Sequence, residues 1–588
     1  MKNFFIRGNL NTSASINPFQ ILKNLKSCSK EDAINDLKAG LSVAMLSFSM
    51  GIAYAMIAGL PVKYGLFGGI IAAFVSFVFS SSRFIMFGPS NASAVMLMSA
   101  FASMGLETEA QRVAAASAVV FFVGLFLIVA SFLKITNFVR YVSRTVITGY
   151  ITAGGLLIIA NQLNSALGIQ EIEKSSPNLF GELSQTLSAI GDCNVQAISV
   201  CALTLAILFA CKIFFKKLPA QAIALILAAA ICAIFGKFHD LDLSYIASVS
   251  VSDWSFTPPD FKQVPLRQLA ISSLAVALFC VIESTSIGKS MAAKNAERLN
   301  TNQEMFSLGI ANMLASLFSS TVESGSLTRS AAANDAGART VFINLFSGIF
   351  MLLGVFVFGS YIGYIPSASL SAVVIVIAFS LFSRKALRLA LRSTWEDALV
   401  FWLTFITGVV SSLDDAVYVG VCASIILFLK KASAPEVMEV AIGDDGEERK
   451  LEDPAQKRDP EISIVHVGGN LFFGASDVFQ DQVRRICQSP SIKVLILKLR
   501  SAINFDASSA ADIDELASQM RERGGVLYLC EVSPEIMKVL KSSKVAKSVG
   551  EGNIFAYTDE NPTLSTAYAL KAAKKFLKGG RAEVEIYV

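Results

Sequence analysis

The chain has 588 residues, of which 53% are hydrophobic and only 16% are charged, whereas soluble domains carry about 25% charged residues. This depletion excludes an ordinary soluble protein and indicates an integral protein of the lipid bilayer. The net charge of +4 is too small to indicate a nucleic-acid partner.

Cysteine and histidine give no sign of a disulfide framework or a metal site. None of the nine cysteines forms a CxxC pair, most of them lie inside apolar runs, and the chain has only two histidines. Cysteines in such surroundings behave as small hydrophobic residues. We therefore expect neither a disulfide framework nor a zinc site, and no metal centre built from histidine side chains.

Residues 1–36 are polar and basic, and we interpret them as a cytoplasmic arm without a cleavable signal peptide. Fourteen apolar segments follow within residues 37–431, and most approach the roughly 20 residues that span a bilayer. The first seven lie near residues 37–58, 64–80, 91–102, 113–133, 142–163, 195–213 and 220–235. The second seven lie near residues 269–291, 305–318, 327–333, 341–358, 362–382, 398–410 and 416–428.

The joins between these segments alternate in charge. The even-numbered joins are basic and contain Arg83, Lys134, Arg140, Arg144, Lys212, Lys216, Lys217, Lys289, Lys294, Arg298, Arg339, Arg384, Lys385, Arg388, Arg392, Lys430 and Lys431. The odd-numbered joins are mainly acidic and contain Glu107, Glu109, Glu171, Glu173, Glu182, Asp240, Asp242, Asp253, Glu323, Asp414 and Asp415, with Arg112 and Lys174 as exceptions. Because basic joins face the cytoplasm, both termini are predicted on that side.

Two sets of seven segments must run in opposite directions, because seven is odd. The third segment of each set is short and follows a polar break, Gly88-Pro89-Ser90-Asn91 in the first set and Ser324-Gly325-Ser326 in the second. Interrupted segments at matching places in two repeats point to a transport site. We expect two helix N-termini to face each other at the bilayer midplane. The alternative is a pair of short re-entrant helices that only pack.

Arg329 lies in the second of these short segments, three residues after Ser326. The start of a helix offers free N–H groups and a positive dipole end, which attract anions. An arginine at membrane depth is costly and is by default a functional hypothesis. The alternative is an arginine near a helix end that extends to the cytoplasmic surface.

The composition changes after Lys431. Residues 432–460 are charged and contain prolines, and we interpret them as a linker. Strand patterns at residues 462–467, 494–499 and 525–529 alternate with helical patterns near 475–488 and 510–522. This alternation predicts a small α/β domain over residues 461–570, followed by a basic tail, residues 571–588, that begins as a helix.

Several strings of residues resemble the SulP anion transporters, the sulfate permease family. They are Pro61-Val62-Lys63-Tyr64-Gly65-Leu66-Phe67, Ser82-Arg83, Gly88-Pro89-Ser90, Asn302-Gln303-Glu304, Gly309-Ile310-Ala311-Asn312, Ser326-Leu327-Thr328-Arg329-Ser330, Gly337-Ala338-Arg339-Thr340 and Tyr364-Ile365-Pro366 with Ala368. The second domain resembles the STAS domain that follows the membrane part in this family. The resemblance extends from about Asp36 to the C-terminus, with Phe67 in place of a tyrosine.

The resemblance implies a polytopic α-helical membrane protein of 14 transmembrane segments, arranged as two inverted seven-segment repeats with a core and a gate domain, and then a small α/β STAS domain. It implies a homodimer in the plasma membrane, the inner membrane of a bacterium, with no enzyme activity. The implied function is secondary active transport, a symport by an elevator-like motion. Its substrate is a small inorganic or carboxylate anion, with sulfate first and bicarbonate or a dicarboxylate as others. The alternatives are a passive anion channel, an exchanger, or a membrane-tethered signalling protein.

The family resemblance also implies a substrate site between the third and tenth segments. It implicates backbone N–H groups near Ser90, Asn91, Ala92, Leu327 and Thr328, with Thr328 and Arg329 matching a Ser-Arg pair that contacts the anion in prestin-like members. The first segment carries Ser49 where the family usually has proline, and Ser49 and Tyr54 are further candidates for the cavity.

Glu283 matches the carboxylate of the family's eighth segment and is the candidate ion-coupling residue. Burial favours the neutral form of a carboxyl group, which suits reversible binding of H⁺. A Na⁺ site would instead keep Glu283 ionised, with Ser284 and Thr285 nearby. A third interpretation is that Glu283 only pairs with Lys289 or Arg329. No cofactor other than such a coupling ion, H⁺ or Na⁺, is expected.

Two further motifs are incomplete. Gly288-Lys289-Ser290 resembles the end of a P-loop, but Glu283 occupies the position of the required first glycine, so nucleotide binding is not predicted. In the STAS-like domain, Asp506 is followed by Ala507, where anti-sigma antagonists carry a phosphorylated serine. A phosphorylation switch at that position is impossible, and we favour a role in assembly or docking, although Ser508 is adjacent.

Overall fold

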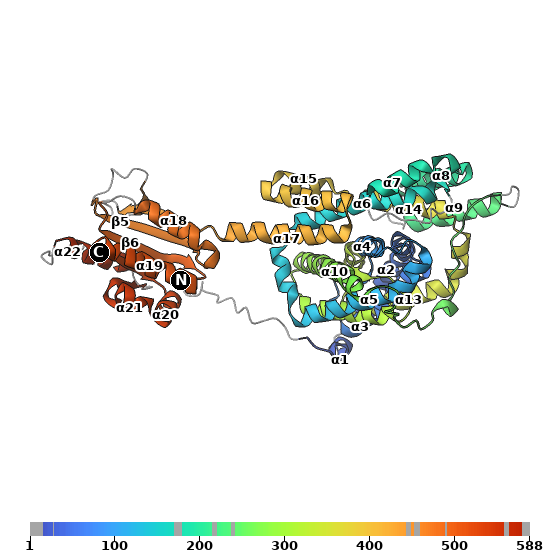
Figure 1. Ribbon diagram of the computed structural model, residues 1–588. Coiled ribbons are helices and arrows are strands. Elements are labelled where there is room, and N and C mark those ends of the chain that lie inside the picture. Colours follow the sequence, from blue (N-terminus) through green and yellow to red (C-terminus); the bar gives the residue numbers. More distant parts are fainter. Residues whose placement is uncertain are drawn as a thin grey trace. The chain divides into compact units, whose positions relative to one another are not determined.

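A computed structural model describes residues 16–26, 29–169, 179–214, 220–236, 241–442, 448–451, 459–487, 491–557 and 564–578. Some predicted features lie outside these residues: residues 1–15 of the arm, Glu171, Glu173, Lys174, Lys216, Lys217, Asp240, residues 443–447 and 452–458 of the linker, and residues 579–588 of the tail. The chain divides into two compact units between Ser424 and Ile425. The first is helical and the second contains a sheet (Figure 1).

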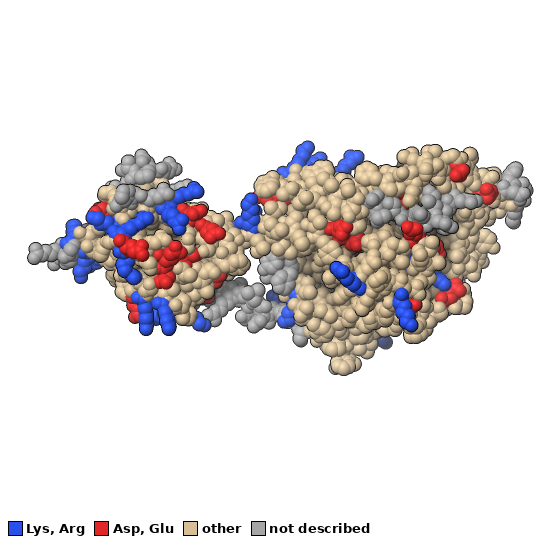
Figure 2. Space-filling view, viewed as in Figure 1, with Lys and Arg blue, Asp and Glu red and all other residues tan. Residues whose placement is uncertain are grey.

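Each of the fourteen predicted membrane segments coincides with a helix. The first set is α2 (Lys30–Ile57), α3 (Val62–Phe79), α4 (Asn91–Ser103), α5 (Glu109–Phe132), α6 (Arg144–Leu167), α8 (Val195–Phe214) and α9 (Ala220–Phe235). The second set is α10 (Leu266–Lys294), α11 (Thr301–Ser316), α12 (Leu327–Asp335), α13 (Phe342–Phe358), α14 (Ser367–Ser380), α16 (Trp395–Val410) and α17 (Leu413–Ala432). Eight of the described helices are long and apolar enough to cross a membrane. The visible face of this unit carries few charges (Figure 2).

Some helical boundaries follow capping residues rather than hydropathy. The helix α2 begins seven residues before the predicted apolar segment, because Ser29 and Asp32 form a capping box at its start. The short helices α1 (Gln20–Lys26), α7 (Leu179–Ser188) and α15 (Arg384–Arg392) were not predicted. In α15, basic residues leave too little apolar sequence to signal a span.

The helices of the first unit pack in two groups. The first four helices of each set contact one another, as in the pairs α2–α13, α3–α11, α5–α11 and α4–α10. The last three of each set form the other group, through pairs such as α6–α16 and α14–α8. Gly420 joins α17 to this group, because a Cβ there would lie 2.3 Å from Oγ1 of Thr404 on α16. The grouping follows repeat position rather than order in the chain.

Two short strands precede the two short helices. β1 (Phe87–Pro89) comes before α4, and β2 (Glu323–Gly325) comes before α12. The strands pair antiparallel, with Gly88 opposite Ser324 and Pro89 opposite Glu323. Because each strand runs directly into its helix, this pairing brings the N-termini of α4 and α12 to the same place.

Three acidic residues that we assigned to outer joins are buried instead, and one of them is Glu182 on α7, which is 4% exposed. Glu323 is fully buried on β2, and Asp414 is 5% exposed and accepts a hydrogen bond from the Ser99 hydroxyl at 3.1 Å. Hydropathy counts any polar residue between two apolar runs as part of a loop, although a strand inside the protein gives the same pattern. The charge alternation therefore depends on the other residues of these joins, including exposed Asp415.

We expect cysteine labelling to place Asp415 and Lys385 on opposite sides of the membrane. Both residues are exposed, and the joins that contain them differ in charge. In a variant without the nine native cysteines, Asp415→Cys should react with an impermeant maleimide added outside whole cells. Lys385→Cys should react only after the membrane is permeabilised. Labelling of both from the same side would contradict the predicted topology.

The second unit contains a six-stranded sheet in the order β4-β3-β5-β6-β7-β8. Its strands are β3 (Glu436–Ile442), β4 (Glu448–Lys450), β5 (Ile462–Asn470), β6 (Val494–Ile503), β7 (Val526–Val532) and β8 (Ile554–Ala556). β5 to β8 are parallel, and β3 is antiparallel to both its neighbours. The three predicted strands coincide with β5, β6 and β7, whereas β3 and β4 lie within the predicted linker, where glutamates mask the strand pattern.

Helices cover both faces of this sheet. Leu495 and Leu497 of β6 face the core shared with α18 (Ser476–Ile486), α19 (Ala507–Glu522), α20 (Pro534–Ser542) and α21 (Val545–Val549). Val494 and Ile496 face the opposite core, shared with α22 (Leu564–Leu577). Successive residues of a strand point to opposite faces, so a continuous apolar run such as β6 is expected where both faces are covered. The visible face of the unit is rich in both charge signs (Figure 2).

Candidate functional site

The starts of α4 and α12 are held by serine caps. The hydroxyl of Ser90 accepts the backbone N–H of Ser93 at 3.0 Å, and the hydroxyl of Ser93 accepts that of Ser90 at 3.1 Å. Ser93 also donates to the carbonyl of Val322, just before β2, at 3.1 Å. Ser326 caps α12 by accepting the N–H of Arg329 at 3.4 Å. The polar breaks are therefore built into the structure as linked helix caps.

Glu283 lies on α10 beside both breaks. Its Oε2 accepts hydrogen bonds from the hydroxyls of Ser324 at 2.6 Å and Ser90 at 3.2 Å. One carboxylate thus bridges the residue that caps α4 and a residue of β2. The next residue, Ser284, accepts the N–H of Gly325 at 2.9 Å. Because α10 holds both breaks, a change at Glu283 would act on both helix starts.

Arg329 is turned inward from α12 and is only 1% exposed. Its guanidinium lies against β1, where a Cβ at Gly88 would be 2.6 Å from Nη1. Gly88 has a φ of +153°, so both space and backbone geometry require glycine there. Within the described residues, Nε and Nη2 have no hydrogen-bond partner. A buried guanidinium with open donors is suited to receive an anion, because unpaired buried donors are costly.

The other predicted site residues differ in their placement. Tyr54 is buried on α2, and its hydroxyl interacts electrostatically with Arg329 and Glu283. Asn91 accepts the N–H of Ala92 through its side chain at 2.8 Å, so this N–H is already paired. Leu327 and Thr328 are both exposed, unlike Arg329 beside them.

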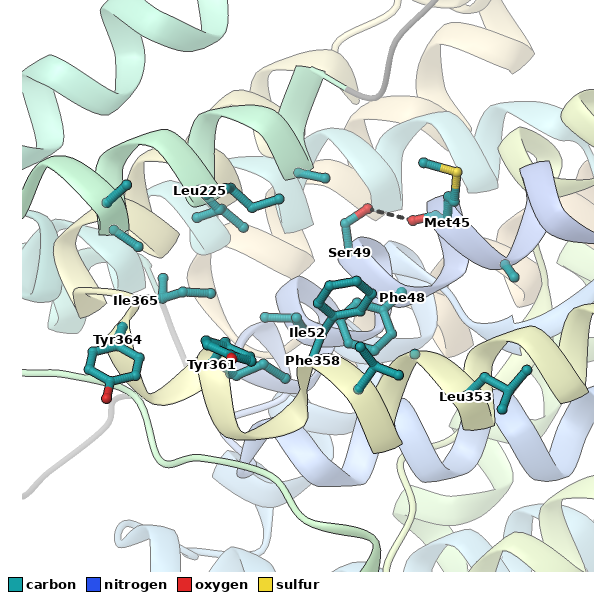
Figure 3. Close-up of a pocket in the computed structure, with 18 of the residues that line it drawn as sticks. Met45, Phe48, Ser49, Ile52, Leu225, Leu353, Phe358, Tyr361, Tyr364 and Ile365 are labelled. Carbon is teal, nitrogen blue, oxygen red and sulfur yellow. Dashed lines mark hydrogen bonds between the residues drawn. The ribbon is translucent and has the colours of Figure 1, made fainter. Parts of the chain in front are cut away.

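Ser49 lines a groove that the other predicted site residues do not line. It lines an apolar groove of about 700 Å³ with residues of α2, α9, α13 and the turn after α13 (Figure 3). Its hydroxyl is bonded within its own helix, to the carbonyls of Met45 and Leu46, both at 3.2 Å. Neither Tyr54 nor Arg329 lines this groove.

Sequence reasoning missed two neighbours of the site. Ser324 was interpreted only as part of a polar break, and Glu323 as an acidic residue of an outer join. Glu323 is fully buried, and its Oε1 accepts the hydroxyl of Ser320 at 3.0 Å. A signal was available, because Glu323 directly precedes the second break at a place where the join is short.

The remaining motifs contribute no ligand chemistry. Gly288-Lys289-Ser290 lies inside α10 and is helical, so it forms no phosphate-binding loop. Among the described residues there is no group of three or more His, Cys, Asp or Glu side chains that could hold a metal ion. Burial raises the pKa of the Cys530 thiol to about 12, so this cysteine remains a neutral core residue.

The loop before α19 has a structural role for its aspartate. The Asp506 side chain caps α19 by accepting the N–H of Ser509 at 3.0 Å, and it also accepts the N–H of Phe473 at 2.9 Å. Burial acts to raise the pKa of Asp506, but these hydrogen bonds outweigh it and the pKa is lowered. Asp506 is therefore an ionised helix cap, with Ala507 as the first helical residue.

Comparisons with known proteins agree for both units. Residues 34–404 match the sulfate permease family, and residues 453–561 match the STAS domain. The putative sulfate transporter YvdB of Bacillus subtilis is 25% identical over 530 residues, covering 89% of this chain and 96% of its own. The probable sulfate transporter Rv1739c of Mycobacterium tuberculosis is 25% identical over 528 residues, covering 88% and 93%.

Solved structures agree on the fold. Murine Solute Carrier 26 family member A9, an anion transporter in the inward-facing state, matches with a TM-score of 0.83 and 18% identity, covering 97% of each chain. The transmembrane domain of a cyanobacterial bicarbonate transporter, BicA, matches with a TM-score of 0.59 and 20% identity, covering 68% of this chain and 98% of its own. At these identities the likeness establishes the polytopic helical fold and says nothing of the substrate.

Proposed function

Because this chain belongs to the sulfate permease family, a family of anion transporters, we propose that it carries a small anion across the plasma membrane by secondary active transport. Sulfate is the first candidate, since relatives from two bacteria are named as sulfate transporters. The other candidates are dicarboxylates and bicarbonate, the substrate in the name of a structural relative. The proposal further includes a homodimer with both termini in the cytoplasm.

The observation that carries the proposal is the β1–β2 pair, which brings two helix N-termini to the buried Arg329. Each N-terminus contributes roughly half a positive charge. With the guanidinium, the site has about two positive charges, offset by Glu283. An anion bound there would bring the site closer to neutrality, which lowers the cost of moving it across an apolar barrier.

The grouping of the helices supports an elevator-like motion. The first four helices of each set contain the proposed anion site, and the last three pack mainly against one another. The groove that contains Ser49 lies between α2 and α13 of the first group and α9 of the second (Figure 3). Its lining is almost entirely apolar, so one group can slide along the other without breaking polar contacts there.

We propose that a proton at Glu283 couples transport to the ion gradient. Its Oε2 accepts hydrogen bonds from the hydroxyl groups of Ser90 and Ser324, and a hydroxyl group can also accept a hydrogen bond from a protonated carboxyl group. Sodium would need a shell of several acceptor oxygens at that carboxylate. The proton would reduce the negative charge beside the anion and so favour joint binding.

Replacing Glu283 by glutamine should abolish accumulation of anion against its gradient, while anion exchange between the two sides persists. The amide keeps the size of the side chain but cannot release a proton. The measurement is uptake of radiolabelled sulfate, bicarbonate, succinate and chloride into proteoliposomes, with and without a pH gradient. Accumulation equal to that of the parent would return Glu283 to a structural role. Equal uptake by the parent with and without gradients would indicate a channel.

A further inference from the structure

We propose that Glu323 is a second proton-binding carboxylate of the anion site and that it matches the site to a divalent anion carried with two protons. This inference rests on the proposed function and on the charge of Arg329. Glu323 lies on β2, four residues before Leu327, where α12 begins. It is fully buried, as is the guanidinium of Arg329.

Glu323 and Glu283 lie on opposite sides of the β1–β2 pair. Successive strand residues point to opposite faces. Ser324 points to α10, where its hydroxyl reaches Glu283 at 2.6 Å. Glu323 points to α3, where a Cβ at Gly68 would lie only 2.0 Å from Oε1. The two carboxylates therefore flank the strand pair that aligns the two helix starts.

The backbone around Glu323 is fixed, whereas its carboxylate is only half satisfied. Asn312 of α11 accepts the N–H of Glu323 at 2.9 Å and donates to its carbonyl at 3.0 Å. The hydroxyl of Ser320 donates to Oε1 at 3.0 Å. Across the residues that the structure describes, Oε2 has no partner. An ionised carboxylate that is buried with an unpaired oxygen is costly, and a proton on that oxygen removes the charge.

Within the part of the chain that the structure describes, the neighbours of Glu323 supply a single counter-charge. Arg329 interacts electrostatically with Glu323 and with Glu283, so the two carboxylates share one guanidinium. Among the described residues, the titratable or charged groups around the two carboxylates are Arg329 of α12, Glu283 and Cys280 of α10, Tyr54 of α2 and Tyr150 of α6. From α3 and α11, Gly68 and Asn312 bring no charge.

The charges of the site then determine which anion fits it. Arg329 and two helix N-termini give about two positive charges, and two ionised carboxylates cancel them. A divalent anion restores neutrality only when both carboxyl groups are protonated. The protons come from the water on the side where the anion enters, form O–H bonds on Glu283 and Glu323, and leave with the anion on the other side. Gradient energy from two protons would thus act on each anion. Net accumulation needs both carboxylates, because a site with only one of them would have to return empty with an uncompensated positive charge, and it would then support exchange alone.

The test measures sulfate binding to the purified full chain by calorimetry across a range of pH. The slope of log Kd against pH counts the protons taken up with the anion. In the steepest range, we expect Kd to rise about 100-fold per pH unit in the parent and about 10-fold in Glu323→Gln and in Glu283→Gln. The control is Glu304→Gln. Glu304 is also fully buried, but both its carboxylate oxygens accept hydrogen bonds, from the hydroxyls of Ser80 and Ser81 and from the N–H of Ser81. The Glu304→Gln variant should show the same slope of log Kd against pH as the parent.

A Glu323→Gln protein with the parent's slope overturns the inference. If that variant does not fold, Glu283→Gln provides the test. A Kd for sulfate that still rises about 10-fold per pH unit in this variant supports a second proton site, whereas a Kd that does not depend on pH overturns the inference. A parent that binds and transports only monovalent anions overturns this inference and leaves the proposed function intact. A parent that transports no anion in proteoliposomes overturns the proposed function itself.

Discussion

Replacing Lys498 by alanine is expected to lower the free energy of unfolding of the second unit by about 3–5 kcal/mol. Lys498 on β6 and Glu531 on β7 form an ion pair of 3.1 Å, with both side chains 3% exposed. Truncating the lysine leaves the carboxylate of Glu531 buried without its cation, and the cost of that unpaired charge exceeds the value of the pair itself.

The surroundings of Glu531 increase this effect. The hydroxyl of Thr566 donates to its Oε1 at 2.8 Å, and that of Ser565 accepts its N–H at 2.9 Å, so the start of α22 is attached to the pair. Glu531 also has a φ of +55°, which is unfavourable for a residue with a side chain. Loss of Lys498 should therefore loosen α22 as well as the sheet.

Hydrogen exchange of the β6 and β7 amides in the full chain measures this free energy. The matched control is Lys493→Ala, whose partner Glu461 lies 2.5 Å away but is 40% exposed. Exposed pairs are worth about 0–1 kcal/mol, so the control should change protection little. Equal losses of amide protection in the two variants would show that the buried ion pair stabilises the unit no more than the exposed one does.

Thirteen of the fourteen helices that match predicted segments were predictable because each has its own apolar run, and hydropathy depends on composition rather than on distant contacts. The exception is the polar helix α12, which was predicted from the break before it, at the place that matches the first set. The STAS sheet was predictable in part because β5, β6 and β7 are apolar runs. The pair of Lys498 and Glu531 was not predictable, because its partners are separated by 33 positions in the sequence and nothing local to either residue indicates which residue it pairs with.

The candidate site shows a similar limit. The two breaks and Arg329 were found because polar residues stand out between apolar segments at matching places. The paired strands β1 and β2 are too short to give a pattern, and so the role of Ser324 as a bridge to Glu283 could not be read from the sequence. Ser49 was predicted to contribute its hydroxyl group to the substrate cavity. In the structure this hydroxyl donates a hydrogen bond to a carbonyl of its own helix, as serine side chains in helices often do.

Replacing Arg329 by alanine should weaken anion binding by about 1.5–3 kcal/mol, the range for hydrogen bonds to charged groups, or roughly 10- to 150-fold in Kd. Nε and Nη2 are buried donors without partners among the described residues, so an anion that reaches them gains hydrogen bonds that no other group has to give up. The alanine variant would also leave Glu283 and Glu323 without their shared counter-charge, which opposes the entry of another negative charge.

Arg329→Lys separates the charge of this residue from its geometry. Lysine restores the positive charge but not the planar fork of donors, so it should recover only part of the lost affinity. The control is Lys294→Ala, which removes a cation from an exposed pair with Asp335 at the other end of α12. Binding of sulfate and of the other anions to the purified proteins, measured by calorimetry, decides the matter. If Arg329→Ala binds as tightly as the parent, the two helix N-termini alone must hold the anion, and the buried guanidinium would then serve to balance the two carboxylates.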